Sequence, residues 1–214
     1  MYLPKAHEES RIEVLHELMR THPLGSMITT GKEGLAANHI PFLLDPTVGE
    51  FGTLKAHVAR ANPVWQDFST DIESLVIFQG SQAYISPNWY PSKHEHGKMV
   101  PTWNYAVVHA YGIPKVVDDA AWLLKLIGDL TDTHEASQKI PWKVSDAPQD
   151  FTERMLDMIV GLEIPITKII GKWKVSQNRT PADRLGVAAG LTSRNDDESR
   201  AMAALVMQTI RDQA

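Results

Sequence analysis

The sequence predicts a mainly β protein of the α+β class, in which helices flank a region of antiparallel strands. Between residues 25 and 112, short apolar or alternating segments are separated by glycine and proline, a pattern typical of strands joined by turns. Residues 10–22 and the region after residue 117 carry apolar residues at helical spacing instead. The chain has 214 residues, of which 43% are hydrophobic, and this is enough to close one sizeable core.

In the first half, a helix is predicted from the Ser10/Glu13 capping-box pair to His22-Pro23, where proline ends it. Asn62-Pro63 predicts a short helix over 64–68, with asparagine as its cap. Gly80-Ser81 separates two apolar segments and predicts a two-residue type II′ hairpin turn. The predicted strands are 26–29, 36–44, 52–59, 75–79, 82–86 and 103–111.

In the second half, Asp118 or Asp119 is predicted to cap a helix with Trp122, Leu123, Leu126, Ile127 and Leu130 on one face. A second helix is predicted from Asp146 to Gly161, with Phe151, Met155, Met158 and Ile159 buried. The apolar phase of segment 162–175 switches along its length, which predicts a strand with a bulge or bend near 167–170. Thr180-Pro181 and the Asn195/Glu198 pair predict two terminal helices.

Composition limits the possible chemistry. The chain has no cysteine, so disulfides, thiolate nucleophiles and cysteine-ligated metal centres are excluded. The formal net charge of -5 does not favour binding to nucleic acid by the surface as a whole. The start lacks the apolar core of a signal peptide, and no apolar run is long enough to span a bilayer, so we expect a cytoplasmic protein without a membrane partner.

Two strand segments carry cations on one face. Lys55 and His57 alternate with apolar residues, and Arg60 and the predicted helix at 62–63 follow directly, a combination that suits a phosphate group. In 170–178, Lys172 and Lys174 share a face, and Gln177 next to them has an amide that can read the edge of a planar ring. The alternative for both segments is an ordinary solvated strand face.

The stretch "YISPNWYPSKHEHGKMVPTWNY" (84–105) is too rich in proline for a helix and holds an unusual number of aromatic residues. It leads into a strand that is bulky on one face and small on the other, which leaves room for a flat ligand or a neighbouring subunit. Aromatic core packing is the alternative. His94 and His96 lack a third ligand, so no metal site is predicted.

The stretch "YISPNWYPSKHEHGKMVPTWNYAVVHAYG", with "GTLKAHVARANPVWQDF" before it and "EIPITKIIGKWKVSQNR" after it, resembles the PaiB-type family of FMN-binding negative transcriptional regulators. The likeness runs from "MYLPKAHEE" to "GVAAGL", nearly the whole chain. It implies a split β-barrel, normally a homodimer with FMN in clefts between subunits. Residues 1–179 are then the FMN-binding barrel with its N-terminal and inserted helices, and 180–214 are C-terminal helices packed on the same domain.

The resemblance also implies roles for individual residues. It makes Lys55, His57 and Arg60 candidates for the FMN phosphate and places His39 on a barrel strand near the flavin. It implies that four more side chains reach the flavin across the subunit interface: Trp103, Asn104, Lys174 and Gln177.

The function so implied is FMN-dependent regulation of transcription. The alternatives are a flavin-dependent oxidoreductase and a haem-binding or haem-degrading protein, so whether the chain is an enzyme stays open. There is no clear helix-turn-helix signal, and the last helix begins acidic and carries only Arg200 and Arg211, which argues against direct reading of DNA.

Overall fold

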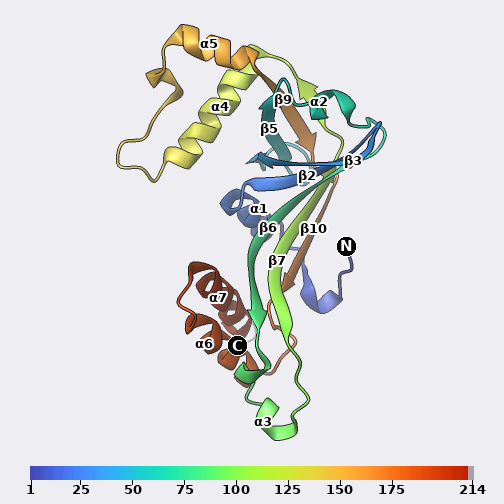
Figure 1. The fold of residues 1–214 in the computed structure, drawn as a ribbon, viewed down its shortest axis with the longest axis vertical. Helices are drawn as coiled ribbons and strands as arrows, with labels where there is room; N and C mark the ends of the chain where they lie inside the picture. The colour runs from blue at the N-terminus through green and yellow to red at the C-terminus, as the bar shows by residue number, and fades with distance from the viewer. Residues whose placement is uncertain (212–214) are drawn as a thin grey trace. The chain divides into compact units, whose positions relative to one another are not determined.

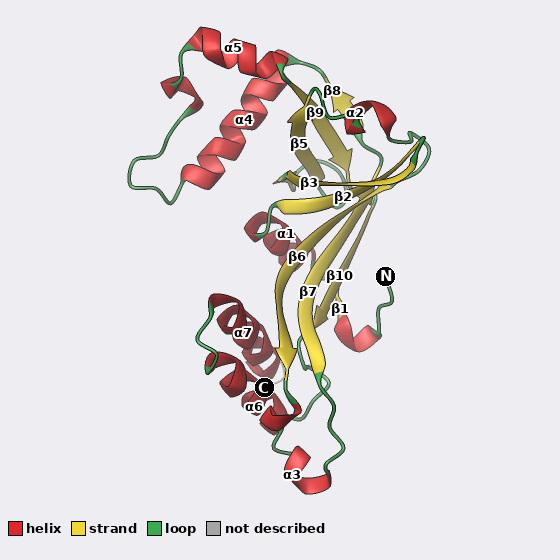
Figure 2. Ribbon diagram, in the orientation of Figure 1, coloured by secondary structure: helices red, strands yellow, loops and turns green. Residues whose placement is uncertain are grey.

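The computed structural model describes residues 1–211, without the side chain of His96. Over this range the chain forms helices and antiparallel strands, which are often grouped, as in the run from β2 to β5 (Figures 1 and 2). The helices are α1 (Ile12–Thr21), α2 (Val64–Asp67), α3 (Lys93–His96), α4 (Ala120–Glu135), α5 (Gln149–Asp157), α6 (Pro181–Thr192) and α7 (Asp197–Arg211). The strands are β1 (Glu8–Glu9), β2 (Leu24–Gly31), β3 (Gly34–Pro41), β4 (Leu43–Asp45), β5 (Thr53–Ala59), β6 (Ser74–Ile85), β7 (Thr102–Gly112), β8 (Lys115–Val117), β9 (Ile159–Pro165) and β10 (Lys168–Lys174).

The strands of residues 1–211 form two sheets. The larger sheet has the order β1-β10-β7-β6-β2-β3 and the smaller has the order β4-β5-β9-β8. The registered pairs, such as β2 with β3 and β5 with β9, are antiparallel. The mainly β, α+β prediction of split-barrel type is confirmed.

The chain divides into two compact units, and strands β6, β7 and β10 have residues in both. Unit 1 contains residues 1–18, 79–108 and the described part of the chain from Ile170 onward. Unit 2 contains residues 19–78 and 109–169. The predicted division at residue 179 stays a prediction.

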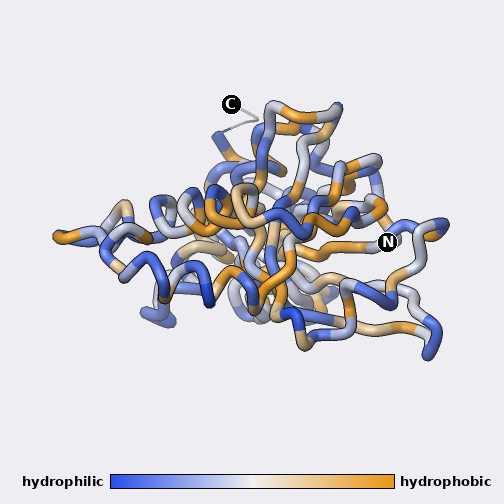
Figure 3. Tube along the Cα trace, turned by 90° about the horizontal axis from the view of Figure 1, so that it is seen from above, coloured by the Kyte–Doolittle hydropathy of each residue, from blue (hydrophilic) through white to orange (hydrophobic). Residues whose placement is uncertain are grey.

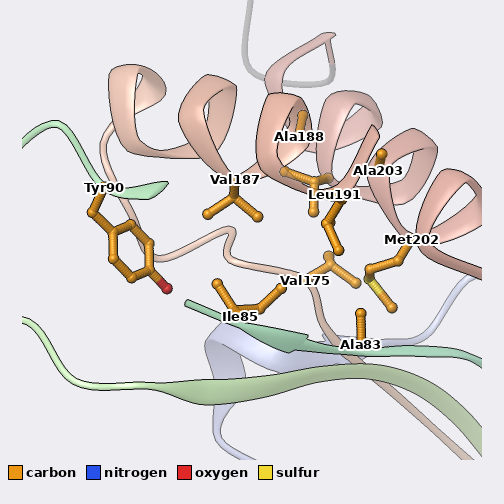
Figure 4. Packing of buried hydrophobic residues seen from close by; sticks show 10 residues of the cluster. Ala83, Ile85, Tyr90, Val175, Val187, Ala188, Leu191, Met202 and Ala203 are labelled. Carbon is orange, nitrogen blue, oxygen red and sulfur yellow. The ribbon is translucent and has the colours of Figure 1, made fainter. Parts of the chain in front are cut away.

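The core of unit 1 lies between the C-terminal helices and strand ends. Figure 4 shows Val187 and Leu191 of α6 and Met202 of α7 facing Ile85 of β6 and Val175, which follows β10. Packing is close, because a Cβ added at Gly186 would lie 2.1 Å from the carbonyl oxygen of Trp89. The C-terminal helices therefore belong to this core.

The core of unit 2 includes one face of the smaller sheet. Leu54, Ala56 and Val58 of β5 are buried together with Leu162 and Ile164 of β9. Because side chains alternate along a strand, the other face is left for the polar residues of β5. Asp119 caps helix α4, and its carboxylate accepts a hydrogen bond from the amide of Trp122 at 2.7 Å, as predicted.

The predicted hairpin at Gly80-Ser81 is wrong, because β6 runs through both residues without a turn. Gly80 does not have the positive φ that a type II′ turn needs. A Cβ at this position would lie 2.9 Å from a terminal carbon of Leu18 and 3.4 Å from the carbonyl oxygen of Ala106. Glycine here serves close packing within the sheet and not a change of direction.

The second inserted helix is shorter than predicted. Asp146 lies in a 3₁₀ turn, α5 ends at Asp157, and Gly161 is inside β9. Phe151, Met155 and Met158 are exposed, while Leu156 is buried, so the predicted buried stripe is wrong. A side chain does not fit at Gly161, because a Cβ there would lie 2.4 Å from the ring of Trp122.

Segment 162–175 is two strands, since β9 ends at Pro165 and β10 begins at Lys168 in the other sheet. The switch of apolar phase marks this change of sheet. At the last helix, Asp196 and not Asn195 caps the N-terminus, because its carboxylate accepts from the amide of Ser199 at 2.8 Å. Thr180 caps α6 as predicted.

None of the helices within residues 1–211 is both long and apolar enough to cross a bilayer. Figure 3 shows hydrophobic and hydrophilic residues interleaved along the trace.

Candidate functional site

The eight predicted site residues divide equally between the two units, and each group is described by itself. Unit 2 holds His39, Lys55, His57 and Arg60, and unit 1 holds Trp103, Asn104, Lys174 and Gln177.

Lys55 lies on the polar face of β5, half-buried, opposite Glu163 of β9. Its ammonium donates a hydrogen bond to Asp45 Oδ2 at 2.8 Å. This bond, with further hydrogen bonds from Thr47, lowers the pKa of Asp45 to about 2. Lys55 therefore already has a carboxylate partner, although an ammonium with three donors can bind a second acceptor.

His57 shares the face of Lys55 and lies opposite Gly161. Its Nδ1 is buried and has no hydrogen-bond partner among the described residues. Burial lowers the pKa of the imidazole, so at neutral pH His57 is uncharged. It can offer one hydrogen bond to a ligand but no positive charge.

Arg60 is occupied by protein partners. Its guanidinium donates to both carboxylate oxygens of Asp118 at 2.9 and 2.7 Å, to the carbonyl of Asp157 at 2.8 Å and to that of Ile159 at 3.0 Å. These contacts join the end of β5 to the start of β9 and to the segment before α4. Phosphate binding by Arg60 stays a prediction, and a phosphate would have to replace some of these bonds.

His39 is exposed on β3, where its Nδ1 lies 3.0 Å from Ser26 Oγ of β2. The preceding strand residue, Asn38, accepts a hydrogen bond from the side chain of Asn62 at 2.9 Å. Asn62 Oδ1 also accepts a hydrogen bond from the amide of Val64 at 3.0 Å, but the N-cap residue of α2 is Pro63 and not Asn62 as predicted. The bond between Asn38 and Asn62 ties strand β3, which carries His39, to the turn that follows β5. The four predicted residues of unit 2 therefore lie on backbone segments that are joined to one another.

In unit 1, Trp103 and Asn104 are neighbours on β7 with opposite surroundings. Trp103 is 52% exposed and meets Tyr84 edge-on, with ring centroids 6.3 Å apart. Asn104 is 1% exposed and donates to Ser176 Oγ at 2.9 Å. Because successive side chains of a strand point to opposite faces, one ligand on one face does not contact both.

Lys174 and Gln177 also have partners in the protein. The ammonium of Lys174 donates to Thr102 Oγ1. The amide of Gln177 accepts from the backbone N–H of Val175 at 2.8 Å and donates to the carbonyl of Trp173. Gln177 therefore closes the turn after β10, next to Ser176, which has a positive φ of 65°.

The aromatic stretch is anchored to α6. The carboxylate of Asp183 accepts from the amide of Ser92 at 3.1 Å and from its hydroxyl at 2.8 Å. Burial acts to raise the pKa of Asp183, but hydrogen bonds from Ser92 and Thr180 hold it below its usual value. Trp89 and Tyr90 pack in the unit 1 core, so the predicted alternative of core packing accounts for these two rings.

Sequence reasoning missed one residue of this region. Lys172 is not among the predicted site residues, and the alternative of a solvated strand face does not fit it, because it is only 7% exposed. The period-two pattern predicts which strand face Lys172 is on. The burial of Lys172 depends on a distant segment, which contacts it through the carbonyl of Tyr2.

No group of three or more His, Asp or Glu within the described residues is arranged to hold a metal ion. His94 is exposed on α3, and the side chain of His96 lies outside the described part of the chain.

A family model described as "Putative FMN-binding domain" matches residues 1–168. An uncharacterized protein of Emericella nidulans is 34% identical, with 97% of each chain covered. The protease synthase and sporulation protein PAI 2 of Bacillus subtilis is 29% identical, with 100% of each chain covered. The structure of the FAD and heme binding protein from Mycobacterium smegmatis matches with a TM-score of 0.56 and 15% identity, covering 78% of this chain and 73% of that one. This last likeness concerns the fold alone.

Proposed function

The chain belongs to the family of FMN-binding domains whose model it matches, and on this premise we propose that it is a homodimeric FMN-binding protein that regulates transcription. The observation that carries the proposal is the family match over residues 1–168, which includes all three predicted phosphate residues. The similarity over the whole chain to the protease synthase and sporulation protein PAI 2 of Bacillus subtilis supports the proposal.

The polar face of β5 fits a phosphate in part. Lys55 supplies a charged donor, and His57 has a buried ring nitrogen without a partner, which a ligand would satisfy. Arg60 is bonded to Asp118 and holds the turn after β5 in place, so its guanidinium is not free for a phosphate. We therefore propose Lys55 and His57 as the phosphate contacts, with FMN supplying redox chemistry when it is bound.

A second copy of the chain is proposed to cover strand β3. This strand is at one edge of the larger sheet, and most of its residues are exposed, including Leu35 at 79%. A long exposed edge strand presents unpaired backbone groups that favour pairing with another chain. Replacing Leu35 by glutamate is expected to weaken the dimer, measured as a lower mass by light scattering at equal concentration. An unchanged dimer would place the interface elsewhere.

Direct reading of DNA is not the favoured route to regulation. Helices α6 and α7 follow one another closely, as in a helix-turn-helix, but the exposed residues at the start of α7 are Asp197 and Glu198. Arg200 is bonded to Asp197 and Asn195. Acidic residues at the N-terminus of a recognition helix oppose approach to phosphates, so we propose that a partner protein mediates the effect.

The flavin proposal is tested by the visible spectrum and by FMN titration of the purified protein. Lys55→Met is expected to weaken FMN binding about tenfold, since charged hydrogen bonds to phosphate are strong, and to leave riboflavin binding nearly unchanged. Lys115→Met is the matched control, because Lys115 lies in the same sheet, exposed, opposite Glu163. A protein that neither carries nor takes up FMN overturns the proposal.

The regulatory proposal needs its own experiment. Sheared genomic DNA is passed over the immobilised protein at about 50 and 200 mM salt, with and without cell extract. Specific enrichment only with extract is expected. Specific, salt-sensitive enrichment by the pure protein would contradict mediation by a partner, and rapid reduction of bound flavin by NADH would favour an oxidoreductase instead.

A further inference from the structure

Lys172 of β10 is a buried lysine without an acidic partner. Its ammonium donates to the carbonyl of Tyr2 at 3.0 Å and lies 5.3 Å from the ring centroid of Tyr105. Glu8 stands opposite in the β1–β10 register but is exposed, and within residues 1–211 no carboxylate forms an ion pair with Lys172. A buried ammonium loses its hydration, so an uncompensated charge destabilises the fold unless an anion accompanies it.

Lys174 increases the positive charge at this place, and the imidazole of His7 lies beside the two lysines. Lys174 lies two residues along the same face of β10 and donates to the hydroxyl of Thr102, again without an acidic partner in the described chain. Burial lowers the pKa of His7, and the charges of Lys172 and Lys174 lower it further. A hydrogen bond with Gln177 acts in the opposite direction but does not outweigh them. The three side chains therefore form one cluster, in which two ammonium groups have neutral oxygen partners.

The surroundings suit a small ligand. Tyr2 is 83% exposed, so the carbonyl that now contacts Lys172 belongs to a surface residue that can yield its place to a stronger acceptor. Trp103 and Tyr105 share one face of β7, and Tyr105 contacts Lys172 while Trp103 is open to solvent. Charged acceptors bind an ammonium more strongly than a peptide carbonyl does.

We propose that Lys172 and Lys174, with His7 beside them, form a binding site for an oxyanion, either a phosphate or a carboxylate, carried by a small ligand. The cations of β5 and of the turn after it differ from this pair, because Lys55 is paired with Asp45 and Arg60 with Asp118. The site does not depend on the proposed phosphate contacts of β5. Its anion has two possible sources: the phosphate of FMN, in which case this site replaces Lys55 and His57 as the phosphate contact, or a separate small acid.

The experiment measures thermal unfolding of the full-length protein in an anion-poor buffer at constant ionic strength. The additions are inorganic phosphate, benzoate, riboflavin and FMN, each at low millimolar concentration or below, so that general salting effects stay small. Wild type is compared with Lys172→Met and with Lys168→Met. Lys168 is the matched control, since it lies on the same strand, exposed, 4.6 Å from the ring centroid of Tyr111.

We expect phosphate or benzoate to raise the Tm of wild type and of Lys168→Met, and the apparent affinity of Lys172→Met for the anion to fall at least about tenfold. Without anion, Lys172→Met should unfold at or above the wild-type Tm, because it removes an uncompensated charge. If Lys172→Met does not fold, Lys174→Met is tested for the same loss of response. No response in wild type, or an undiminished response in the folded variant, overturns the proposal.

The additions also identify the source of the anion. If FMN stabilises wild type more than riboflavin does, and Lys172→Met abolishes the difference, the anion is the FMN phosphate. If benzoate acts through Lys172 while the FMN–riboflavin difference is retained, the ligand is a separate acid. A response to phosphate in a protein that does not bind flavin would support this site and reject the proposed function.

Discussion

Arg60 and Asp118 form a two-bond ion pair that holds the end of β5 to the segment before α4. The pairing raises the pKa of Arg60 and lowers that of Asp118. The same guanidinium also donates to the carbonyls of Asp157 and Ile159. Arg60 is predicted to bind a ligand, but in the structure its side chain links several backbone segments by hydrogen bonds.

The first prediction concerns the hydrogen bonds of Arg60. Arg60→Met is expected to lower the Tm more than Asp118→Asn, because only the arginine change also removes the bonds to the two carbonyls. Thermal unfolding of both single variants and the double variant measures this, and the double variant should be close to Arg60→Met alone. Equal single effects would show that the carbonyl bonds contribute little, and additive effects would show that the two side chains are not coupled.

The second prediction concerns Gly161. Gly161→Ala is expected to lower the free energy of unfolding by about 1–3 kcal/mol, because the added methyl group meets the ring of Trp122 and the carbonyl oxygen of Val117. Gly128→Ala in α4 is the control, since a Cβ added there would have open space within 4 Å, and it should stabilise by roughly 0.5–1 kcal/mol. Urea unfolding measures both, and a neutral Gly161→Ala would contradict the packing described here.

The third prediction concerns acid stability through Asp45. Its pKa is about 2 in the folded protein against an ordinary value of 3.8. Because the folded pKa is the lower one, the carboxylate stabilises the fold above pH 3.8, and this contribution is lost as the pH falls toward 2. Asp45→Asn should therefore be less stable than wild type at pH 7 in urea unfolding, with a difference that disappears near pH 2. A difference that persists there would assign the effect to the lost hydrogen bonds and not to the charge.

The fourth prediction concerns His57. Burial lowers its pKa below the ordinary value of 6.5, so the unfolded chain takes up this proton at a higher pH than the folded one. The stability that the neutral imidazole contributes is present above pH 6.5 and is lost as the pH falls below it. Titration by NMR should show His57 still neutral at pH 6.5. A His57 that titrates at or above pH 6.5 would show that its ring nitrogen is solvated.

Local signals in the sequence were enough to predict where several helices begin or end. The cap at Asp119, the proline after α1, and Thr180-Pro181 at the start of α6 each act within one turn of helix, so neighbouring residues decide them. The alternation along β5 likewise predicted which side chains share its polar face.

Other features depend on contacts between distant segments. Gly80 had the residue type of a turn, but its place against Leu18 and Ala106 makes it part of a strand. Gln177 had the residue type of a ligand contact, but it is bonded to the backbone of Trp173 and Val175.

The sequence by itself determined the fold class, the principal helices and strands, and, through long ordered motifs, the family. The tertiary structure alone decided which polar side chains are free to act, because a charge is neutralised or buried by groups that lie far along the chain. Arg60 meets Asp118 across 58 positions, and Lys172 meets the carbonyl of Tyr2 across 170. Periodicity records only which way a side chain points, and the partner it meets there is decided when the segments pack.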